Sequence, residues 1–145
     1  MAGWKRVVVG VDGSDCSRRA LQWAVEEAGQ RGAEVVAVMA WTPARPPIAS
    51  PEGPPVPWDH LAEPEKEAKF LLEHVIAEEL GGSPAAKVTA TVKEGHPAKI
   101  LTDLSRDADL LVVGTRGHGG FVGLLLGSVS QHVSAHAPCS VVVIR

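Results

Sequence analysis

Short apolar runs alternate with helix-like patterns along the whole chain, and this alternation limits the possible folds more than any other feature. The runs "KRVVVGV" (5–11) and "AEVVAVMAW" (33–41) have no polar face, which is typical of strands covered on both sides. Similar runs occupy 108–114 and 140–145, and a more clearly alternating one at 86–95 suits a sheet edge. Because helices separate the strands, we expect an α/β fold: an open five-stranded parallel sheet with helices on both faces.

The segment after the first strand carries signals for both ends of a helix. Ser14 is a suitable N-cap and Gly32 a suitable stop. Further helices are predicted from near Leu61 to Gly81, from Pro97 onward, and over 127–137. The side chains expected to face inward from these helices are Ala20, Leu21, Ala24, Val25 and Ala28, then Ala68, Leu72, Val75 and Ile76, and then Ile100, Leu101, Leu104 and Ala108.

One stretch breaks the alternation. Residues 42–60, "TPARPPIASPEGPPVPWDH", hold seven prolines, so they form neither a helix nor a central strand. This irregular segment lies within a chain that has no internal repeat, and we expect 1–145 to form one domain.

Composition excludes several function classes. The formal net charge is −3 and the pI is about 6.0, so the chain has no general attraction to nucleic acid or anionic lipid. The longest apolar runs are too short to cross a membrane, and the N-terminus "MAGWKRVVVG" lacks a signal-peptide layout. Cys16 and Cys139 are too few for a disulfide framework and are not spaced for zinc. We therefore expect a cytoplasmic protein in which both cysteines are small buried or half-buried fillers.

Two segments are candidates for a ligand site. Ligands of open parallel sheets bind beyond the carboxyl ends of the strands, where the strand order reverses. The turn "VDGS" (11–14) follows the first strand, and the glycine-rich stretch "GTRGHGGFVGLLLGS" (114–128) follows the fourth. If those two strands are neighbours, both segments meet in one crevice.

The glycine-rich stretch leads into a helix whose first backbone amides, at Ser128, Val129 and Ser130, have no partner within the helix. Such amides and the positive end of the helix dipole form an anion site, to which the two serines add hydroxyl donors. The alternative is a flexible surface loop. The stretch is not a Walker A motif, since Gly127 stands where that motif has lysine, and no G-x-G-x-x-G follows the first strand, so a nicotinamide cofactor is not expected.

The spacing Gly114-x2-Gly117-x9-Gly127-Ser128 resembles the nucleotide-binding signature of the universal stress protein family. The resemblance covers nearly the whole chain, including "VVVGVDGS", "LLVVGTRGHGGFVGLLLGSVSQHV" and "HAPCSVVVIR". It implies a Rossmann-like sheet with the strand order 3-2-1-4-5 and an ATP site, with Mg²⁺ accompanying the phosphates. Ser140 departs from the family pattern, which often has proline at this position.

Carried over by position, the resemblance assigns each motif residue a place around the nucleotide. Asp12 would contact the ribose, and Gly114 would lie along it. Val11 and Ala40 would border the adenine. The phosphates would be held by Gly117, Gly127, Ser128, Val129 and Ser130. The last strand, 140–145, is an apolar edge in this order, and we expect it to pair with a second copy in a homodimer.

Other side chains leave alternatives open. Arg116 and His118 either meet phosphate charge or lie at an exposed loop tip. His132 and His136 are four residues apart and could share a metal, but no third ligand is evident, and we expect His136 to be partly buried. Trp41 either stacks on the base or caps the core. We expect no metal ligand and no catalytic residue, and we treat 63–69, "EPEKEAK", as a solvated helix face.

Three functions compete on this basis. The first is an ATP-binding regulator or sensor in a stress response, whose occupancy or dimer state is read by another protein. The second is an ATPase or adenylyl-transferring enzyme, which requires a base and a cationic clamp near the phosphates. The third is a dimerisation module with a vestigial site, which predicts an eroded glycine motif. The motif is intact, so the first is preferred.

Overall fold

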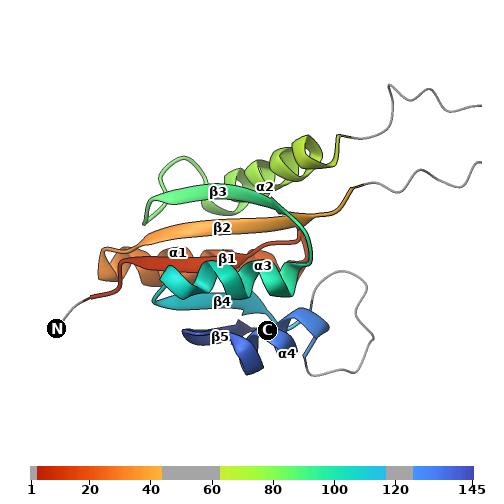
Figure 1. Ribbon diagram of the computed structural model, residues 1–145. Coiled ribbons are helices and arrows are strands. Elements are labelled where there is room, and N and C mark those ends of the chain that lie inside the picture. Colours follow the sequence, from red (N-terminus) through yellow and green to blue (C-terminus); the bar gives the residue numbers. More distant parts are fainter. Residues whose placement is uncertain (1–2, 44–62, 117–125) are drawn as a thin grey trace, which may run out of the picture.

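The computed structural model describes residues 3–43, 63–116 and 126–145. Five parallel strands form one sheet in the order β3-β2-β1-β4-β5, which confirms the expected topology (Figure 1). The strands are β1 (Arg6–Gly10), β2 (Glu34–Trp41), β3 (Val88–Glu94), β4 (Leu110–Gly114) and β5 (Ser140–Ile144). The proline-rich segment 42–60 lies outside the described residues from position 44 onward.

The central strand β1 is paired on both sides. Val7 lies opposite Val35 of β2 and opposite Leu110 of β4. Val7, Val8 and Val9 are almost fully buried, as the run without a polar face predicted. The alternating strand β3 lies at one edge of the sheet, also as expected, and β5 lies at the other.

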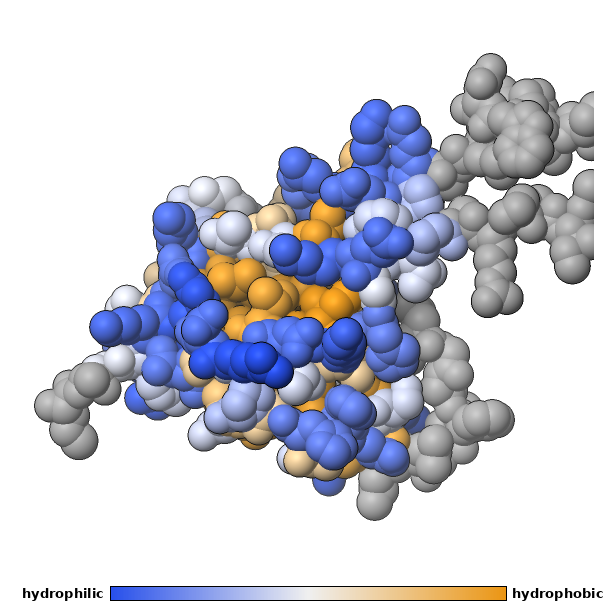
Figure 2. Space-filling model, viewed as in Figure 1, coloured by the Kyte–Doolittle hydropathy of each residue, from blue (hydrophilic) through white to orange (hydrophobic). Residues whose placement is uncertain are grey.

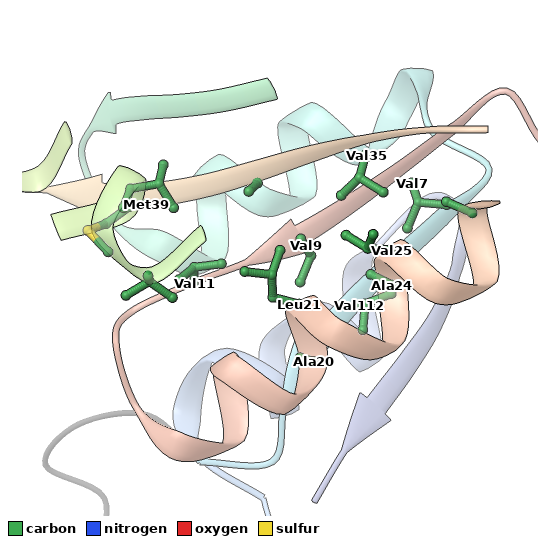
Figure 3. Close-up of a cluster of buried hydrophobic side chains, with 14 of the residues drawn as sticks. Val7, Val9, Val11, Ala20, Leu21, Ala24, Val25, Val35, Met39 and Val112 are labelled. Atoms are coloured by element: carbon green, nitrogen blue, oxygen red, sulfur yellow. The ribbon is translucent and has the colours of Figure 1, made fainter. Parts of the chain in front are cut away.

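Helix α1 (Asp15–Arg31) covers one face of the sheet together with α2. Its ends are those predicted: the Ser14 hydroxyl accepts the N–H of Ser17, and Gly32 ends the helix in the left-handed conformation at φ 68°. The predicted inward stripe of α1 is buried against the sheet (Figure 3). The labelled members of this stripe are Ala20, Leu21, Ala24 and Val25.

Helix α2 (Pro64–Leu80) begins slightly later than the expected start near Leu61, a residue outside the described part. Glu63 adopts a non-helical conformation because a residue before proline is disfavoured in the helical region, and Pro64 then opens the helix. The inward residues Ala68, Leu72 and Val75 are buried as predicted. Glu65, Lys66 and Glu67 are exposed, which confirms the solvated face.

The opposite face carries α3 (Pro97–Leu104) and α4 (Ser128–His136). In Figure 1, α3 crosses in front of the sheet, and α1 lies behind it. The helical pattern continued to Ala108, but α3 ends at Leu104 and a 3₁₀ turn follows over Ser105–Asp107. Ala108 still packs on the core cluster of this face. Figure 2 shows apolar surface beside α3, ringed by hydrophilic side chains.

No helix within the described ranges is both long and apolar enough to span a membrane.

Candidate functional site

A cavity of about 590 Å³ opens beyond the carboxyl ends of β1, β2 and β4. The strand order places β1 beside both β2 and β4, so the turn after β1 and the glycine-rich stretch after β4 reach the same opening. Eight of the nine residues predicted for the site line it: Val11, Asp12, Ala40, Gly114, Gly127, Ser128, Val129 and Ser130. The ninth, Gly117, lies outside the described residues, as does His118.

Ala40 presents backbone groups at one wall of this cavity. The pairing of β1 with β2 ends at Gly10 opposite Val38, and one more bond follows, from the N–H of Val11 to the carbonyl of Val38 over 2.8 Å. Backbone polar groups two residues apart point to the same side of a strand, so the N–H and C=O of Ala40 face the side that β1 has just left. This end of β2 therefore offers a donor next to an acceptor.

The turn after β1 is held by its own side chains. Asp12 accepts the N–H of Ser14 through Oδ1 over 2.9 Å, and the Ser14 hydroxyl donates to the same oxygen. Gly13 has φ 85°, a conformation that favours glycine. The N–H of Asp12 donates to Oγ of Ser17 at 3.2 Å. These hydrogen bonds thus hold the Asp12 carboxylate at the cavity wall.

The base of the glycine-rich stretch is closed by Thr115. Its N–H continues the sheet by donating to Ile144 of β5 over 2.7 Å, and its carbonyl accepts the N–H of Gly127. The Ser130 hydroxyl donates to the same carbonyl at 2.9 Å and also lies 3.0 Å from the Gly127 carbonyl. Both ends of the stretch 116–126 are therefore tied together at one buried residue.

The amino end of α4 opens on the cavity. Gly127 is its N-cap, and no side chain within the described ranges caps it. Gln131 is the first residue to bond back along the helix, to the Gly127 carbonyl at 3.0 Å. The amides of Ser128, Val129 and Ser130 precede that bond, so they and the helix dipole form the positive end of the cavity. Of the two predicted hydroxyl donors, Ser128 is exposed, whereas the Ser130 hydroxyl is used to close the loop base.

Gly114 lies where the start of α1 packs too closely against β4 to leave room for a side chain. A Cβ built there would lie 2.7 Å from Cβ and 2.9 Å from the carbonyl carbon of Cys16, at the start of α1. The missing side chain thus allows α1 to approach β4 closely.

Hydrogen bonding with Thr115 lowers the pKa of the Cys16 thiol below its ordinary value, helped by the N–H of Arg116. Both Cys16 and Cys139 are half-buried, which agrees with their expected role as fillers.

Sequence reasoning missed two walls of the cavity. One comes from α2, with Pro64, Glu67, Ala68 and Leu71. The other comes from α3, with Pro97, Ile100 and Leu101. Leu71 is 40% exposed and lies at the margin of the buried stripe, three residues after Ala68, and the sequence pattern identified this stripe only as packing on the sheet. Arg116 is exposed and is the one cation among the lining residues that the structure describes.

Two side chains outside the cavity bear on alternatives that the sequence left open. His136 is exposed, so its expected partial burial is wrong: its ring packs on the ring of His132, with centroids 4.6 Å apart, on the solvent side of α4. No cluster of three or more potential metal ligands occurs in the described part of the chain. Trp41 packs against the core cluster of the α1 face and is not among the lining residues, which favours the capping interpretation.

A family model, curated relatives and solved structures all match this chain to the same family. The model of the universal stress protein family matches residues 3–145. Universal stress protein Rv2623 of Mycobacterium tuberculosis is 37% identical over 143 residues, a match covering 96% of this chain and 44% of the relative. The chain spans less than half the length of the curated relatives that it matches.

Solved structures share the fold, with matches that cover 99–100% of this chain. The universal stress protein UspA from Lactobacillus plantarum has a TM-score of 0.77 at 24% identity and is covered completely, as is this chain. A universal stress protein in complex with cAMP has a TM-score of 0.72 at 26% identity, over 99% of this chain and 98% of that one. The protein from Archaeoglobus fulgidus in complex with dAMP has a TM-score of 0.64 at 25% identity, over 99% and 100%. The chain belongs to the universal stress protein family.

Proposed function

We propose that this chain binds an adenine nucleotide, ATP with its accompanying Mg²⁺, in the cavity beyond β1, β2 and β4. The observation that carries the proposal is that the backbone edge at Ala40 and the amino end of α4 open on one cavity of about 590 Å³. Relatives solved with cAMP and with dAMP support an adenine nucleotide as the ligand.

The two ends of the cavity suit the two ends of a nucleotide. Adenine carries an acceptor, N1, next to a donor, the N6 amine, and Ala40 offers the complementary N–H and C=O. Val11 borders the same end, and the carboxylate of Asp12 is the natural acceptor for ribose hydroxyls. The phosphates would lie at Gly127 and the amides of 128–130, with Gly117 as a further proposed contact. Mg²⁺ binds mainly phosphate oxygens and water, so it requires few protein ligands.

We further propose that the bound nucleotide serves as a signal within a stress response, with the occupied state read by another protein. Arg116 is the sole described cation at the cavity, which argues against fast phosphoryl transfer. A slow ATPase or an adenylyl-transferring enzyme is the alternative, and a vestigial site in a dimerisation module is the third. Two free, half-exposed cysteines suit a reducing compartment such as the cytoplasm.

The second part of the proposal is a homodimer through β5. In the described residues β5 pairs with β4 alone, and Val141 to Ile144 are half-buried, so an apolar strand edge is left for a second copy. The intact chain should sediment as a dimer at tens of micromolar, roughly the range in which weak dimers form. The carbonyl of Ile144 accepts the N–H of Thr115, so the alternation along the strand directs the N–H of Val143 away from β4, to the free edge. Val143→Pro, which removes that N–H, should give monomer or aggregate. A monomer from the intact chain would refute the dimer.

The test of binding compares two nucleotides that differ only in the base. MgATP at 100 times its dissociation constant should stabilise the fold by about 2.7 kcal/mol, measured as a rise in melting temperature. MgGTP has the same phosphates, but its base places donor and acceptor in the opposite order. A response to MgATP alone supports the adenine site. An equal response to both would reduce the cavity to a phosphate site, and no response to millimolar MgATP would refute the proposal.

A further inference from the structure

Arg18 lies on the first turn of α1, directly after the turn that carries Asp12, and its guanidinium contacts two different elements. Nε donates to the carbonyl of Gly13 over 3.2 Å. Nη1 donates to Glu78 Oε2 at 2.6 Å and to Glu79 Oε1 at 3.0 Å, near the end of α2. One side chain therefore bridges the Asp12 turn and α2.

The bridge is partly shielded from solvent. The side chains of Arg18 and Glu79 are 24% and 19% exposed, and Glu78 is 47% exposed. Hydrogen bonds to the two carboxylates raise the pKa of Arg18, and the guanidinium lowers the pKa of Glu78. Gln22 also donates to Glu79, and His74 lies 2.8 Å from Glu78, so the carboxylates are themselves held in place.

Both elements joined by Arg18 are walls of the cavity. Gly13 stands between Asp12 and Ser14, which both line it, and the first half of α2 supplies Glu67, Ala68 and Leu71. Arg18 itself is not among the lining residues. A side chain that contacts two walls without contacting the cavity can act on a ligand through the placement of those walls.

We propose that Arg18 is a positioning residue: it couples the placement of α2 to the turn that presents Asp12, and nucleotide affinity depends on this bridge. The inference rests on the proposed nucleotide site. Gly13 has φ 85°, and its carbonyl receives a directional donor from Arg18. Without that donor the turn loses a restraint beside Asp12, and α2 keeps two adjacent carboxylates without their cation.

The geometry also excludes lysine as a substitute. The guanidinium directs Nε to one element and Nη1 to the other, whereas a lysine ammonium is a single point of charge on a flexible stem. Arg18→Lys should therefore keep the attraction to Glu78 and Glu79 but lose the bond to Gly13. Failure of lysine to restore affinity distinguishes positioning from simple charge compensation.

The test measures the dissociation constant for MgATP in four proteins, with thermal unfolding as the check on folding. Arg18→Met and Arg18→Lys should each weaken binding about tenfold, the loss of roughly one hydrogen bond. The matched control is Arg6→Met, which removes a single ion pair, Arg6 Nε to Glu34 at 2.9 Å, at the other end of the sheet. Its affinity should equal that of the parent.

A double-mutant cycle tests whether Arg18 and the two glutamates affect nucleotide affinity through one shared interaction or through independent losses of structure. The paired change Glu78→Gln and Glu79→Gln should weaken binding, and adding Arg18→Met to it should cause little further loss, because both remove one bridge. Additive losses, an unchanged affinity in Arg18→Met, or an equal loss in Arg6→Met would each overturn the inference while leaving the nucleotide site intact.

Failure of the parent to bind MgATP would instead refute the proposed function. The bridge itself is then tested by hydrogen exchange without nucleotide, where Arg18→Met should speed exchange of the amides of Asp12 and Ser14 relative to Arg6→Met. Equal exchange in the two variants would overturn the bridge as well.

Discussion

The hydroxyl of Ser130 donates to the carbonyl of Thr115 over 2.9 Å, joining the first turn of α4 to the end of β4. Ser130 is 2% exposed, so this bond is shielded from water. The same carbonyl accepts the N–H of Gly127. The Ser130 hydroxyl, which we expected to be a donor at the anion site, is therefore already used to close the base of the stretch 116–126. In the proposed site Ser130 would contact phosphate through its backbone amide.

Ser130→Ala should consequently act on stability as well as on binding. Its loss leaves the Thr115 carbonyl with one donor fewer in a buried place, which costs about 1–3 kcal/mol of unfolding free energy. Because the change also loosens the base of the stretch 116–126, nucleotide affinity should fall with it. Denaturant unfolding and MgATP titration measure the two effects.

Ser134→Ala is the matched control, since it removes the same atom from the same helix. The Ser134 hydroxyl donates to the Ser130 carbonyl within α4, and Ser134 is exposed. Its loss should change stability by less than about 0.5 kcal/mol, as for most surface substitutions. Equal effects of the two variants would show that the loop closure contributes nothing.

Gly114→Ala tests the packing of α1 against β4. The added Cβ would lie 2.7 Å from Cβ of Cys16 and 3.0 Å from the backbone nitrogen of Ser17, so backbone must move. Such overpacking costs about 1–3 kcal/mol, visible as a lower melting temperature without nucleotide. Gly82→Ala is the control, because nothing lies within 4 Å of its Cβ position. A Gly114→Ala protein as stable as Gly82→Ala would contradict the close approach.

A pH dependence of stability is predicted from Asp109, which lies at the end of the sheet away from the cavity. Asp109 accepts the backbone N–H groups of Lys5 and Arg6 at 2.7 and 3.0 Å, and these bonds lower its pKa in the folded state. A lowered folded pKa means that the stabilisation is present above the unfolded pKa and is lost as pH falls through the folded one. Asp109→Asn should therefore lower the melting temperature at neutral pH and matter progressively less in acid.

Asp103→Asn is the comparison for that series, since its carboxylate is half exposed and faces Arg106 at 3.7 Å. Its effect should be small at every pH, as for isolated surface pairs. A deficit in Asp109→Asn that stays constant down to about pH 2 would show that the carboxylate charge is not the cause.

The architecture could be predicted from the chain because its signals are local and agree with one another. Runs without a polar face marked β1, β2 and β4, and Ser14, Gly32 and Pro97 each mark a helix end in the structure as predicted. The strand order came from the family resemblance, and it brought the turn after β1 and the stretch after β4 to one opening.

What the sequence could not supply are contacts between distant residues. Nothing near Gly114 indicates that Cys16 packs beneath it, and nothing near Arg18 indicates Glu78 and Glu79, which lie sixty positions away. The error at His136 has a different cause. Partial burial was expected because His136 falls beside Val129 and Val133 on a helix, but α4 ends at His136, and its ring packs on that of His132.

The last prediction concerns turnover. Fixed N–H dipoles at the amino end of α4 suffice to hold a triphosphate that brings its own Mg²⁺. Rapid phosphoryl transfer also requires a positioned water and a cation that stabilises the negative charge developing on the leaving oxygen. For an arginine finger this stabilisation is worth about 10³–10⁵ in rate. Arg116, the one described cation at the cavity, is exposed at its rim. We therefore expect phosphate release at a rate far below the roughly 1 s⁻¹ of slow ordinary enzymes.

The measurement is single-turnover phosphate release from the preformed complex, with Arg116→Ala and His118→Ala beside the parent. Slow release, unchanged in both variants, fits a protein that retains its nucleotide as a signal, whereas fast release that either substitution abolishes would establish the enzyme alternative in its place.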